Sequence, residues 1–312
     1  MAKRDLLSMT DLSRADVELI LDTAESFLPI LHRDIKKVPT LRGRTVVNLF
    51  YESSTRTSSS FDLAAKRLSA DTIAVSAKGS AIDKGESLKD TTLTLSAYSP
   101  DIIVIRHPAA GACQLVARNT GASVINAGDG KHQHPSQCLL DLFTLRQTFG
   151  RDLDGLKVAI VGDILHSRVA RSDISGFQML GMRVSVVGPP AMIPREIEAM
   201  GVGVDYDLEK LAEADVVYLL RIQQERMAEG ANFIPSLREY TAMYGISRAR
   251  LRKGQKVMHP GPINRGVEIS AEIADDEDTL ITQQVESGLA VRMAILYRTI
   301  VGFSESDAQE AV

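Results

Sequence analysis

The chain is predicted to be an α/β protein of two domains, each a parallel β-sheet flanked by helices. Short runs rich in Val and Ile alternate with helical stretches, which is typical of parallel strands joined by crossover helices. The alternation starts again near the middle of the chain, and 312 residues are enough for about two domains. These observations argue against an all-α and an all-β architecture.

The first half is predicted to open with a helix, because Ser13 and Asp16 form a capping-box-like pair ahead of an apolar stripe. A second helix is expected over about 58–68. A third is expected over about 135–149, where a proline occupies the first turn and a glycine follows the end. We place the change of domain near this third helix. Strands of this half are expected at about 45–50, 72–77, 102–106 and 123–126.

The second half begins after a polar connector over 151–155. A buried strand over 157–163 leads through a loop into a helix over about 167–180, and the final helix covers about 284–301. Further strands are expected at about 183–187, 215–220 and 256–258. No Gly-x-Gly-x-x-Gly fingerprint follows the first of these strands and no Walker sequence occurs, so no dinucleotide or ATP cofactor is expected.

The composition argues against nucleic-acid-binding, disulfide-rich and membrane-spanning proteins. The 36 basic and 40 acidic residues give a net charge of −4, and no basic stripe indicates a nucleic-acid or membrane partner. Cys113 and Cys138 are too few for a disulfide framework, no signal peptide is evident, and no apolar run is long enough to span a membrane. A soluble, cytoplasmic protein is expected. The spacing of His132, His134 and Cys138 matches no standard zinc pattern, so no metal is expected.

The most informative run is Ser54-Thr55-Arg56-Thr57, which lies where a buried strand turns into a helix. The free N–H groups and positive dipole end of a helix N-terminus favour anions, and an arginine adds a forked, charge-assisted pair to a phosphate. Taken alone, the same four residues are equally typical of an ordinary helix cap with a surface arginine.

Other polar residues also fall at strand ends, the edge at which open α/β sheets bind ligands. In the first half they are Arg106-His107-Pro108 and His134-Pro135-Ser136-Gln137. In the second half they are His166-Ser167-Arg168 and Arg221-Ile222-Gln223. A loop with Ser80 and Lys84 adds one more polar segment. Each could be a solvated surface feature, but together they predict two anionic ligands, one for each domain.

The three first-half motifs, which begin at Ser54, Arg106 and His134, resemble in this order the carbamoyl-phosphate half of the aspartate and ornithine carbamoyltransferases. Within that family, the second half is more similar to the aspartate enzymes, because His259-Pro260-Gly261-Pro262 stands where ornithine enzymes carry His-Cys-Leu-Pro. Arg221-Ile222-Gln223 stands where a carboxylate of aspartate would be bound, and arginines suit the two carboxylates of aspartate better than the cationic side chain of ornithine. The resemblance covers nearly all 312 residues.

The resemblance implies a reaction and a set of site residues. It implies transfer of the carbamoyl group of carbamoyl phosphate to the α-amine of L-aspartate, the second step of de novo pyrimidine biosynthesis, without a cofactor. Arg56, Thr57, Arg106 and His134 would be catalytic. The implied carbamoyl-phosphate residues are Ser54, Thr55, Arg56, Thr57, Arg106, His134, Gln137, Gly261 and Pro262. The implied aspartate residues are Lys84, Arg168, Arg221 and Gln223.

The resemblance also implies an assembly. The C-terminal helix would return to the first domain, giving a carbamoyl-phosphate domain of 1–134 plus 286–312 and an aspartate domain of 135–285. Three copies would form a homotrimer, with Ser80 and Lys84 entering the site from the neighbouring subunit. Whether regulatory chains or a dihydroorotase join that trimer stays open.

Two alternatives remain at this point. An enzyme with another amine acceptor would keep the first half and change the second, and a catalytically silent assembly partner would be expected to lack Arg56, Arg106 or His134, all of which are present. One departure from the family pattern is Ser58, at a position that is often basic in the resembling enzymes.

Overall fold

The structure is a computed structural model that describes residues 4–76, 85–223 and 236–302. It divides into two compact units: unit 1 comprises Met1–Phe143 and Glu286–Val312, and unit 2 comprises Thr144–Val285. The chain therefore passes from unit 1 to unit 2 inside the helix Pro135–Phe149, whereas the predicted domain boundary lies just before that helix. As a boundary between ligand-binding domains, the division at 134/135 stays a prediction.

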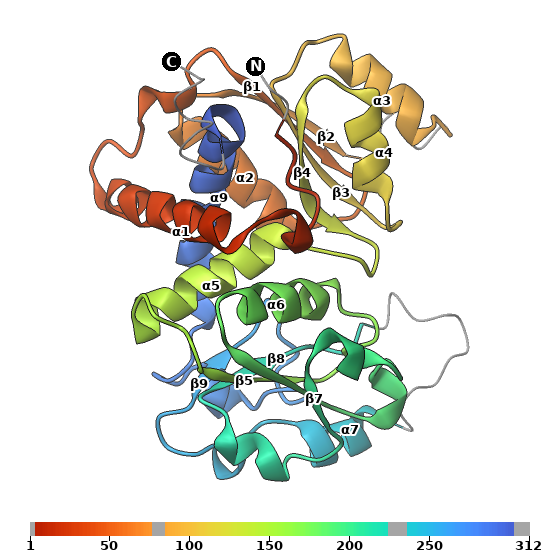
Figure 1. Cartoon of the computed structure of the whole chain (residues 1–312), viewed down its shortest axis with the longest axis vertical. Helices are drawn as coiled ribbons and strands as arrows, with labels where there is room; N and C mark the ends of the chain where they lie inside the picture. Colours follow the sequence, from red (N-terminus) through yellow and green to blue (C-terminus); the bar gives the residue numbers. More distant parts are fainter. Residues whose placement is uncertain (1–3, 77–84, 224–235, 303–312) are drawn as a thin grey trace. The chain divides into compact units, whose positions relative to one another are not determined.

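Unit 1 is built on a four-stranded parallel sheet in the order β2-β1-β3-β4. Figure 1 shows α3 and α4 on one side of this sheet and α1, α2 and α9 on the other. Side chains of α3 and α4, such as Leu95 and Val116, pack on Leu49 and Ile105 of the central strands. The elements are α1 (Arg14–Phe27), β1 (Thr45–Phe50), α2 (Thr55–Arg67), β2 (Asp71–Ser76), α3 (Leu88–Ser96), β3 (Ile102–His107), α4 (Ala112–Asn119), β4 (Ser123–Asp129) and α5 (Pro135–Phe149).

The last helix, α9 (Ile281–Val301), returns to unit 1. Tyr297 meets Phe27 of α1 edge to face with ring centroids 5.8 Å apart, and Nε of Arg298 donates a hydrogen bond of 2.8 Å to Oγ1 of Thr23. The two helices lie together in Figure 1. The predicted return of the C-terminal helix to the first domain is confirmed.

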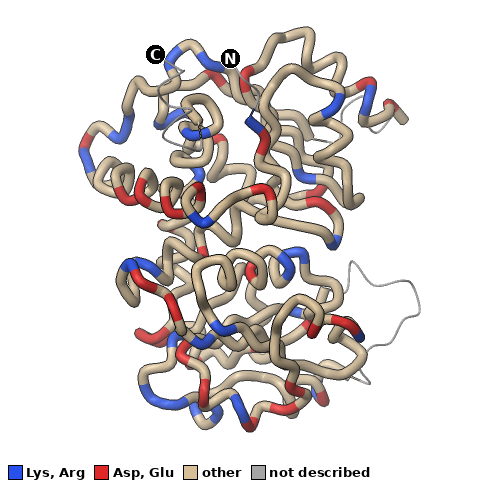
Figure 2. The backbone as a smooth tube through the Cα atoms, viewed as in Figure 1, with Lys and Arg blue, Asp and Glu red and all other residues tan. Residues whose placement is uncertain are grey.

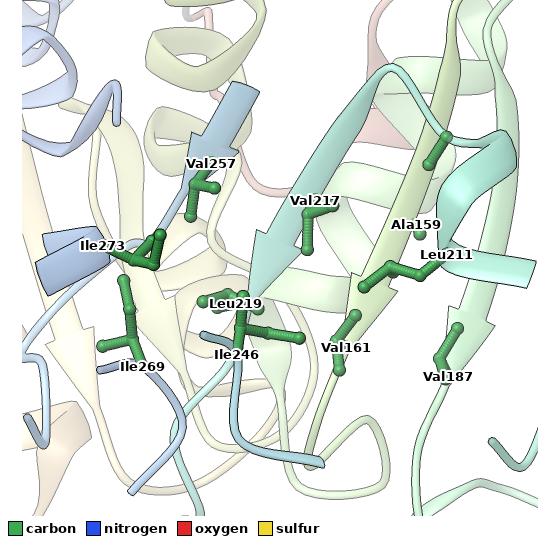
Figure 3. Packing of buried hydrophobic residues seen from close by; sticks show 11 residues of the cluster. Ala159, Val161, Val187, Leu211, Val217, Leu219, Ile246, Val257, Ile269 and Ile273 are labelled. Atoms are coloured by element: carbon green, nitrogen blue, oxygen red, sulfur yellow. The ribbon is translucent and has the colours of Figure 1, made fainter. Parts of the chain in front are cut away.

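Unit 2 is built on a five-stranded parallel sheet in the order β7-β6-β5-β8-β9. Its core gathers β-branched and leucine side chains from β5 and β8 with Ile246, Ile269 and Ile273 (Figure 3). The prediction omitted β7, because two of its three residues are a glycine and an aspartate, which are depleted in strands. The elements are β5 (Lys157–Val161), α6 (Arg168–Met179), β6 (Arg183–Val187), β7 (Gly203–Asp205), β8 (Val216–Leu219), α7 (Leu237–Tyr244), β9 (Lys256–Met258) and α8 (Ala271–Ala274).

The predicted fold class, two domains with helix-flanked parallel sheets, is therefore confirmed. Along the described backbone of each unit, basic and acidic residues are interspersed (Figure 2). None of the helices in the described part of the chain has the length and apolar character that crossing a membrane requires.

Candidate active site

The N-terminus of α2 lies directly after the carboxyl end of β1, as predicted. Ser54 is the N-cap residue, yet its side chain makes no capping hydrogen bond. The other described α-helices with a serine cap, α1, α3, α6, α7 and α8, all have that bond. Thr55 and Arg56 are exposed, whereas Thr57 is buried. Because Ser54 does not cap them, the first N–H groups of α2 can be offered to an anion.

Arg106 lies at the end of β3, beside the end of β1. The N–H of Tyr51 donates a hydrogen bond of 2.8 Å to the backbone oxygen of Arg106, which holds the two strand ends together. The guanidinium Nε donates to Oε2 of Glu52 at 3.2 Å, and both side chains are mostly buried. The sequence patterns did not predict this ion pair, because Glu52 follows β1 whereas Arg106 belongs to β3, and only the sheet order brings them together.

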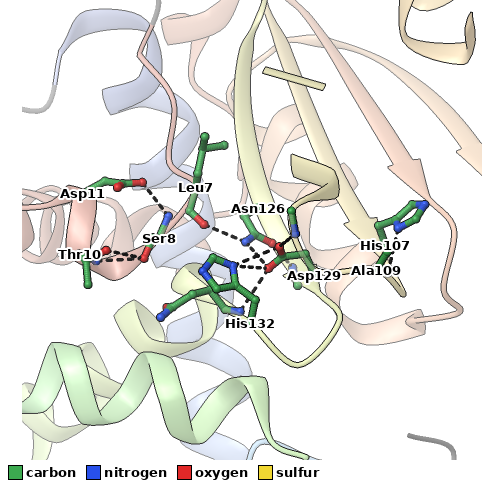
Figure 4. A network of polar contacts seen from close by, with 12 residues as sticks. Leu7, Ser8, Thr10, Asp11, His107, Ala109, Asn126, Asp129 and His132 are labelled. Atoms are coloured by element: carbon green, nitrogen blue, oxygen red, sulfur yellow. Dashed lines mark hydrogen bonds and ion pairs between the residues drawn. The ribbon is translucent and has the colours of Figure 1, made fainter. Parts of the chain in front are cut away.

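A buried carboxylate organises the loop between β4 and α5 (Figure 4). Asp129 is fully buried and accepts hydrogen bonds from the N–H groups of Gly111 and Gln133 and from Nδ2 of Asn126. Its own N–H donates to the backbone oxygen of Gln133, which closes the loop just before His134. Nδ1 of His132 lies 3.1 Å from the same carboxylate. The loop that carries His134 is therefore fixed by charge-assisted bonds.

His134 and Gln137 lie at the start of α5. His134 is 4% exposed, its Nδ1 lies 3.4 Å from Oγ of Ser136, and its backbone oxygen accepts the N–H of Gln137 at 2.9 Å. Nε2 of Gln137 donates to both carboxylate oxygens of the fully buried Asp141, at 3.1 Å each. Cys138 is buried in the same helix.

The structure adds Arg292 of α9, which the sequence patterns did not single out. Its guanidinium donates to Oγ of Ser60 at 3.0 Å and lies 5.3 Å from the ring centre of Phe61. Burial lowers the pKa of Arg292 to about 10, which the Asp141 carboxylate opposes and the nearby charge of Arg56 reinforces. A second guanidinium therefore lies near Arg56, and no local pattern could have shown it, because α9 is more than 200 residues away in sequence.

In unit 2, the predicted residues Arg168, Arg221 and Gln223 follow the ends of the neighbouring strands β5 and β8. Asp163, also fully buried, joins these two segments. It accepts the N–H of Gln223 at 3.0 Å, and its carboxylate lies 2.8 Å from Nδ1 of His166. Arg168 is only 1% exposed, which makes it far more buried than a surface arginine.

The predicted residues Gly261 and Pro262 lie in a turn after β9. The N–H of Gly261 donates to Nδ1 of His259 at 2.8 Å, so the proton of this imidazole is on Nε2, which donates to Oε1 of Glu268 at 3.0 Å. The same oxygen accepts the N–H of Asn264 at 2.6 Å. His259 and Glu268 are buried and hold the turn from inside.

Ser80 and Lys84 lie outside the described residues. Among the other predicted site residues, the structure brings Ser54 to Thr57 together at the head of α2 and places Arg106 beside the end of β1. In unit 2, Asp163 links the segment that leads into Arg168 to Gln223. Within the described ranges, no group of three or more His, Cys, Asp or Glu side chains is arranged to hold a metal ion.

Two family models match the chain almost end to end. Residues 4–147 match the carbamoyl-P binding domain of aspartate/ornithine carbamoyltransferases, and residues 154–299 match the Asp/Orn binding domain. The chain belongs to the aspartate/ornithine carbamoyltransferase family. The resemblance drawn from the sequence motifs is confirmed.

Relatives within the carbamoyltransferase family include catalytic subunits of aspartate carbamoyltransferases. The subunit of Pelotomaculum thermopropionicum is 56% identical over 298 residues, covering 94% of this chain and 96% of that protein. The subunit of Geobacter sulfurreducens is 55% identical over 304 residues, covering 96% and 97%. Both names are those of aspartate enzymes, in agreement with the motifs of the second half.

Solved structures of aspartate transcarbamoylases share the fold. The enzyme of Trypanosoma cruzi in complex with aspartate and phosphate is 30% identical, with a TM-score of 0.85 and coverage of 94% of this chain and 96% of that chain. The catalytic subunit of M. jannaschii is 35% identical, with a TM-score of 0.82 and coverage of 95% and 97%. The T. cruzi enzyme has also been solved with carbamoyl phosphate and aspartate together.

Proposed function

We propose that this protein is an aspartate carbamoyltransferase catalytic chain. It transfers the carbamoyl group of carbamoyl phosphate to the α-amine of L-aspartate, giving N-carbamoyl-L-aspartate and phosphate in pyrimidine biosynthesis. The observation that carries the proposal is the combination of an uncapped helix N-terminus at Ser54 to Thr57 with the strand-end arginine Arg106 and the buried His134. Relatives more than half identical over almost the whole chain carry that name.

Unit 1 would hold carbamoyl phosphate. The first-turn N–H groups of α2, the hydroxyls of Ser54, Thr55 and Thr57 and the guanidinium of Arg56 would bind the phosphate. Thr57, Arg106 and His134 would donate to the carbonyl oxygen, and Gln137 would contact the carbamoyl amine together with the backbone at Gly261 and Pro262. The acidic partner of Arg106, Glu52, would keep its guanidinium oriented.

Unit 2 would hold aspartate. Arg168 and Arg221 suit the two carboxylates, and the amide of Gln223 can either accept or donate a hydrogen bond. Asp163 ties the segments that carry Arg168 and Gln223, so it would fix their spacing before the substrate arrives. Lys84 is the remaining proposed contact of this group.

The chemistry needs no covalent intermediate with the protein. The neutral amine of aspartate attacks the carbonyl carbon and forms the C–N bond, which turns the carbonyl oxygen into an oxyanion. The C=O bond then re-forms as the C–O bond to phosphate breaks and phosphate leaves. Arg106, His134 and Thr57 would stabilise the oxyanion with donors that are already in place, which is the strongest general means of lowering such a barrier. The departing phosphate can take the proton of the amine. We therefore assign His134 the role of donor rather than general base.

The test is a direct assay of products. Purified protein is mixed with carbamoyl phosphate and either L-aspartate or L-ornithine, and the carbamoylated amino acid is identified by mass spectrometry while phosphate release is followed. Carbamoyl-aspartate alone supports the proposal. Citrulline would overturn the assignment of unit 2, and no product from folded protein would favour a silent assembly partner.

We also propose a homotrimer in which Ser80 and Lys84 of a neighbouring subunit complete each site. Light scattering after gel filtration would then report a mass three times the 34.0 kDa of the chain. Co-purification from the native cell would reveal whether regulatory chains or a dihydroorotase join this trimer. We place the enzyme in the cytoplasm, where both substrates are expected, and cell fractionation tests this location.

A further inference from the structure

Gln137 and Asp141 form a buried pair on one face of α5. The two residues are four positions apart, which brings their side chains together on a helix. Nε2 of Gln137 lies 3.1 Å from each carboxylate oxygen, Asp141 is fully buried and Gln137 is 7% exposed. An ionised carboxylate can only accept hydrogen bonds, so the amide of Gln137 must turn its NH₂ group toward Asp141. The carboxylate thus settles an orientation that an amide side chain could otherwise reverse.

The consequence is that the carbonyl oxygen Oε1 of Gln137 faces away from Asp141. In the described part of the chain, this oxygen accepts no hydrogen bond. It is also not one of the side-chain atoms that are buried there without a partner. It is therefore open to a ligand that donates a hydrogen bond. Gln137 lies in the first turn of α5, three residues after His134, whose backbone oxygen accepts the N–H of Gln137. The open acceptor accordingly belongs to the segment assigned to the carbamoyl group.

Arg292 favours the ionised form of the Asp141 carboxylate. It is a buried cation, and its pKa of about 10 leaves it protonated at neutral pH. A buried cation requires a nearby anion, and Asp141 acts on Arg292 as that counter-charge. Gly288 leaves room for the guanidinium, because a Cβ atom there would lie 2.6 Å from Nη1 of Arg292. A neutral residue at position 141 would remove both the counter-charge and the constraint on Gln137.

We propose that Asp141 is a specificity-determining residue that makes Gln137 present an acceptor to the carbamoyl NH₂ group. The site would thereby prefer carbamoyl phosphate to acyl phosphates of the same shape that carry a methyl group in place of the amine. This inference rests on the proposed function. One hydrogen bond of this kind corresponds to a preference on the order of tenfold.

The experiment uses two stable probes of nearly equal shape. Phosphonoacetamide carries the NH₂ group and acetonylphosphonate carries a methyl group in its place. Their dissociation constants, and that of inorganic phosphate, are measured by calorimetry on the intact protein. In Asp141→Asn, the new amide can donate to Oε1 of Gln137 and let its NH₂ group turn toward the ligand. The preference for phosphonoacetamide should then fall by about tenfold, while phosphate affinity stays the same.

A double-mutant cycle shows whether Asp141 acts on ligand preference through Gln137 or by a general disturbance of the site. In Gln137→Met the preference should already be lost, and adding Asp141→Asn should change it no further. The control is Asp101→Asn, which makes the same change in unit 1 at the opposite ends of the strands, where Asp101 accepts the N–H of Thr45. Because Asp141→Asn leaves Arg292 without its counter-charge, Asp141→Asn/Arg292→Met repeats the test with both charges removed.

Three results would overturn the inference. In the first, Asp141→Asn keeps the preference for phosphonoacetamide. In the second, Asp141→Asn lowers that preference equally in the Gln137→Met protein. In the third, it weakens phosphate binding by the same factor as phosphonoacetamide binding, which would mean that Asp141 acts through Arg292 and Arg56. If the wild-type protein made carbamoyl-aspartate and gave any of these results, only the role of Asp141 would fail. If the wild-type protein bound neither probe and made no product, the proposed function would fail with it.

Discussion

Gly162 supports the aspartate half of the proposed site through its lack of a side chain. It follows β5, its φ is +126°, and a Cβ atom there would lie 2.4 Å from the backbone oxygen of Leu220 and 3.1 Å from Oη of Tyr240. The N–H of Leu220 donates a hydrogen bond of 2.8 Å to the backbone oxygen of Val161, and Leu220 directly precedes Arg221. Gly162→Ala must therefore push the end of β8 away from β5 or strain its own backbone.

The magnitude follows from two separate costs. A side chain in this region of φ costs about 1 to 3 kcal/mol, and pressing a methyl group against a hydrogen-bonded backbone costs about 1 to 3 kcal/mol more. The matched control is Gly155→Ala, because Gly155 has a φ of +76° but no atom within 4 Å of the added Cβ. That variant should lose only the backbone term of about 1 to 2 kcal/mol.

Urea unfolding of both variants, followed by circular dichroism at one protein concentration, tests this reasoning. Gly162→Ala should unfold at clearly lower urea than Gly155→Ala, and its KM for aspartate should rise because Arg221 and Gln223 follow the displaced residue. Equal midpoints for the two variants would refute the argument from close approach. A normal KM in a destabilised Gly162→Ala protein would separate the packing from the proposed substrate contacts.

Three further predictions concern His134, Glu268 and His107. His134→Ala should lower kcat by about 10²- to 10³-fold with little change in the inhibition constant of phosphate, since it removes an oxyanion donor, and an unchanged kcat would reject that role. Glu268→Ala should raise KM for carbamoyl phosphate, whereas Glu268→Gln keeps an acceptor for His259 and Asn264 and should stay closer to wild type in the same steady-state assay. Burial lowers the pKa of His107, so the unfolded chain takes up this proton first as the pH falls below about 6.5, and stability is lost. His107→Gln should therefore lose less stability than wild type between about pH 7 and pH 5, and identical pH profiles of thermal unfolding would contradict this assignment.

Local patterns predicted much of the fold. The strands at 45–50, 183–187 and 256–258 and the helix at 135–149 have the predicted bounds, because their apolar runs and terminal residues are strong local signals. The second helix begins at Thr55, three residues earlier than predicted, because the polar residues before Ser58 hide its first turn. The strand β7 was not predicted, because its glycine and aspartate are more typical of turns than of strands.

The site residues and their roles stay proposals, and only their grouping could be argued from the sequence. Polar residues at strand ends could be grouped from sequence, because parallel strands bring their carboxyl ends to one edge of a sheet. The pairing of Glu52 with Arg106 and the junction of Asp163 with Gln223 could not, because each joins residues more than 50 positions apart. Such pairs depend on the order of strands in the sheet, which no periodicity encodes.

The sequence by itself determined the fold class and the family, because these follow from hydrophobic periodicity and from motifs that are contiguous in the chain. It also predicted anionic ligands from the charge at strand ends. Only the tertiary structure decided which buried charges support those motifs. Arg292 lies near Arg56 because α9 returns to unit 1, and Asp141 is identified as a counter-charge only when that return is known. The physical reason is that a buried charge is stabilised by neighbours in space, whereas the chain records neighbours in sequence.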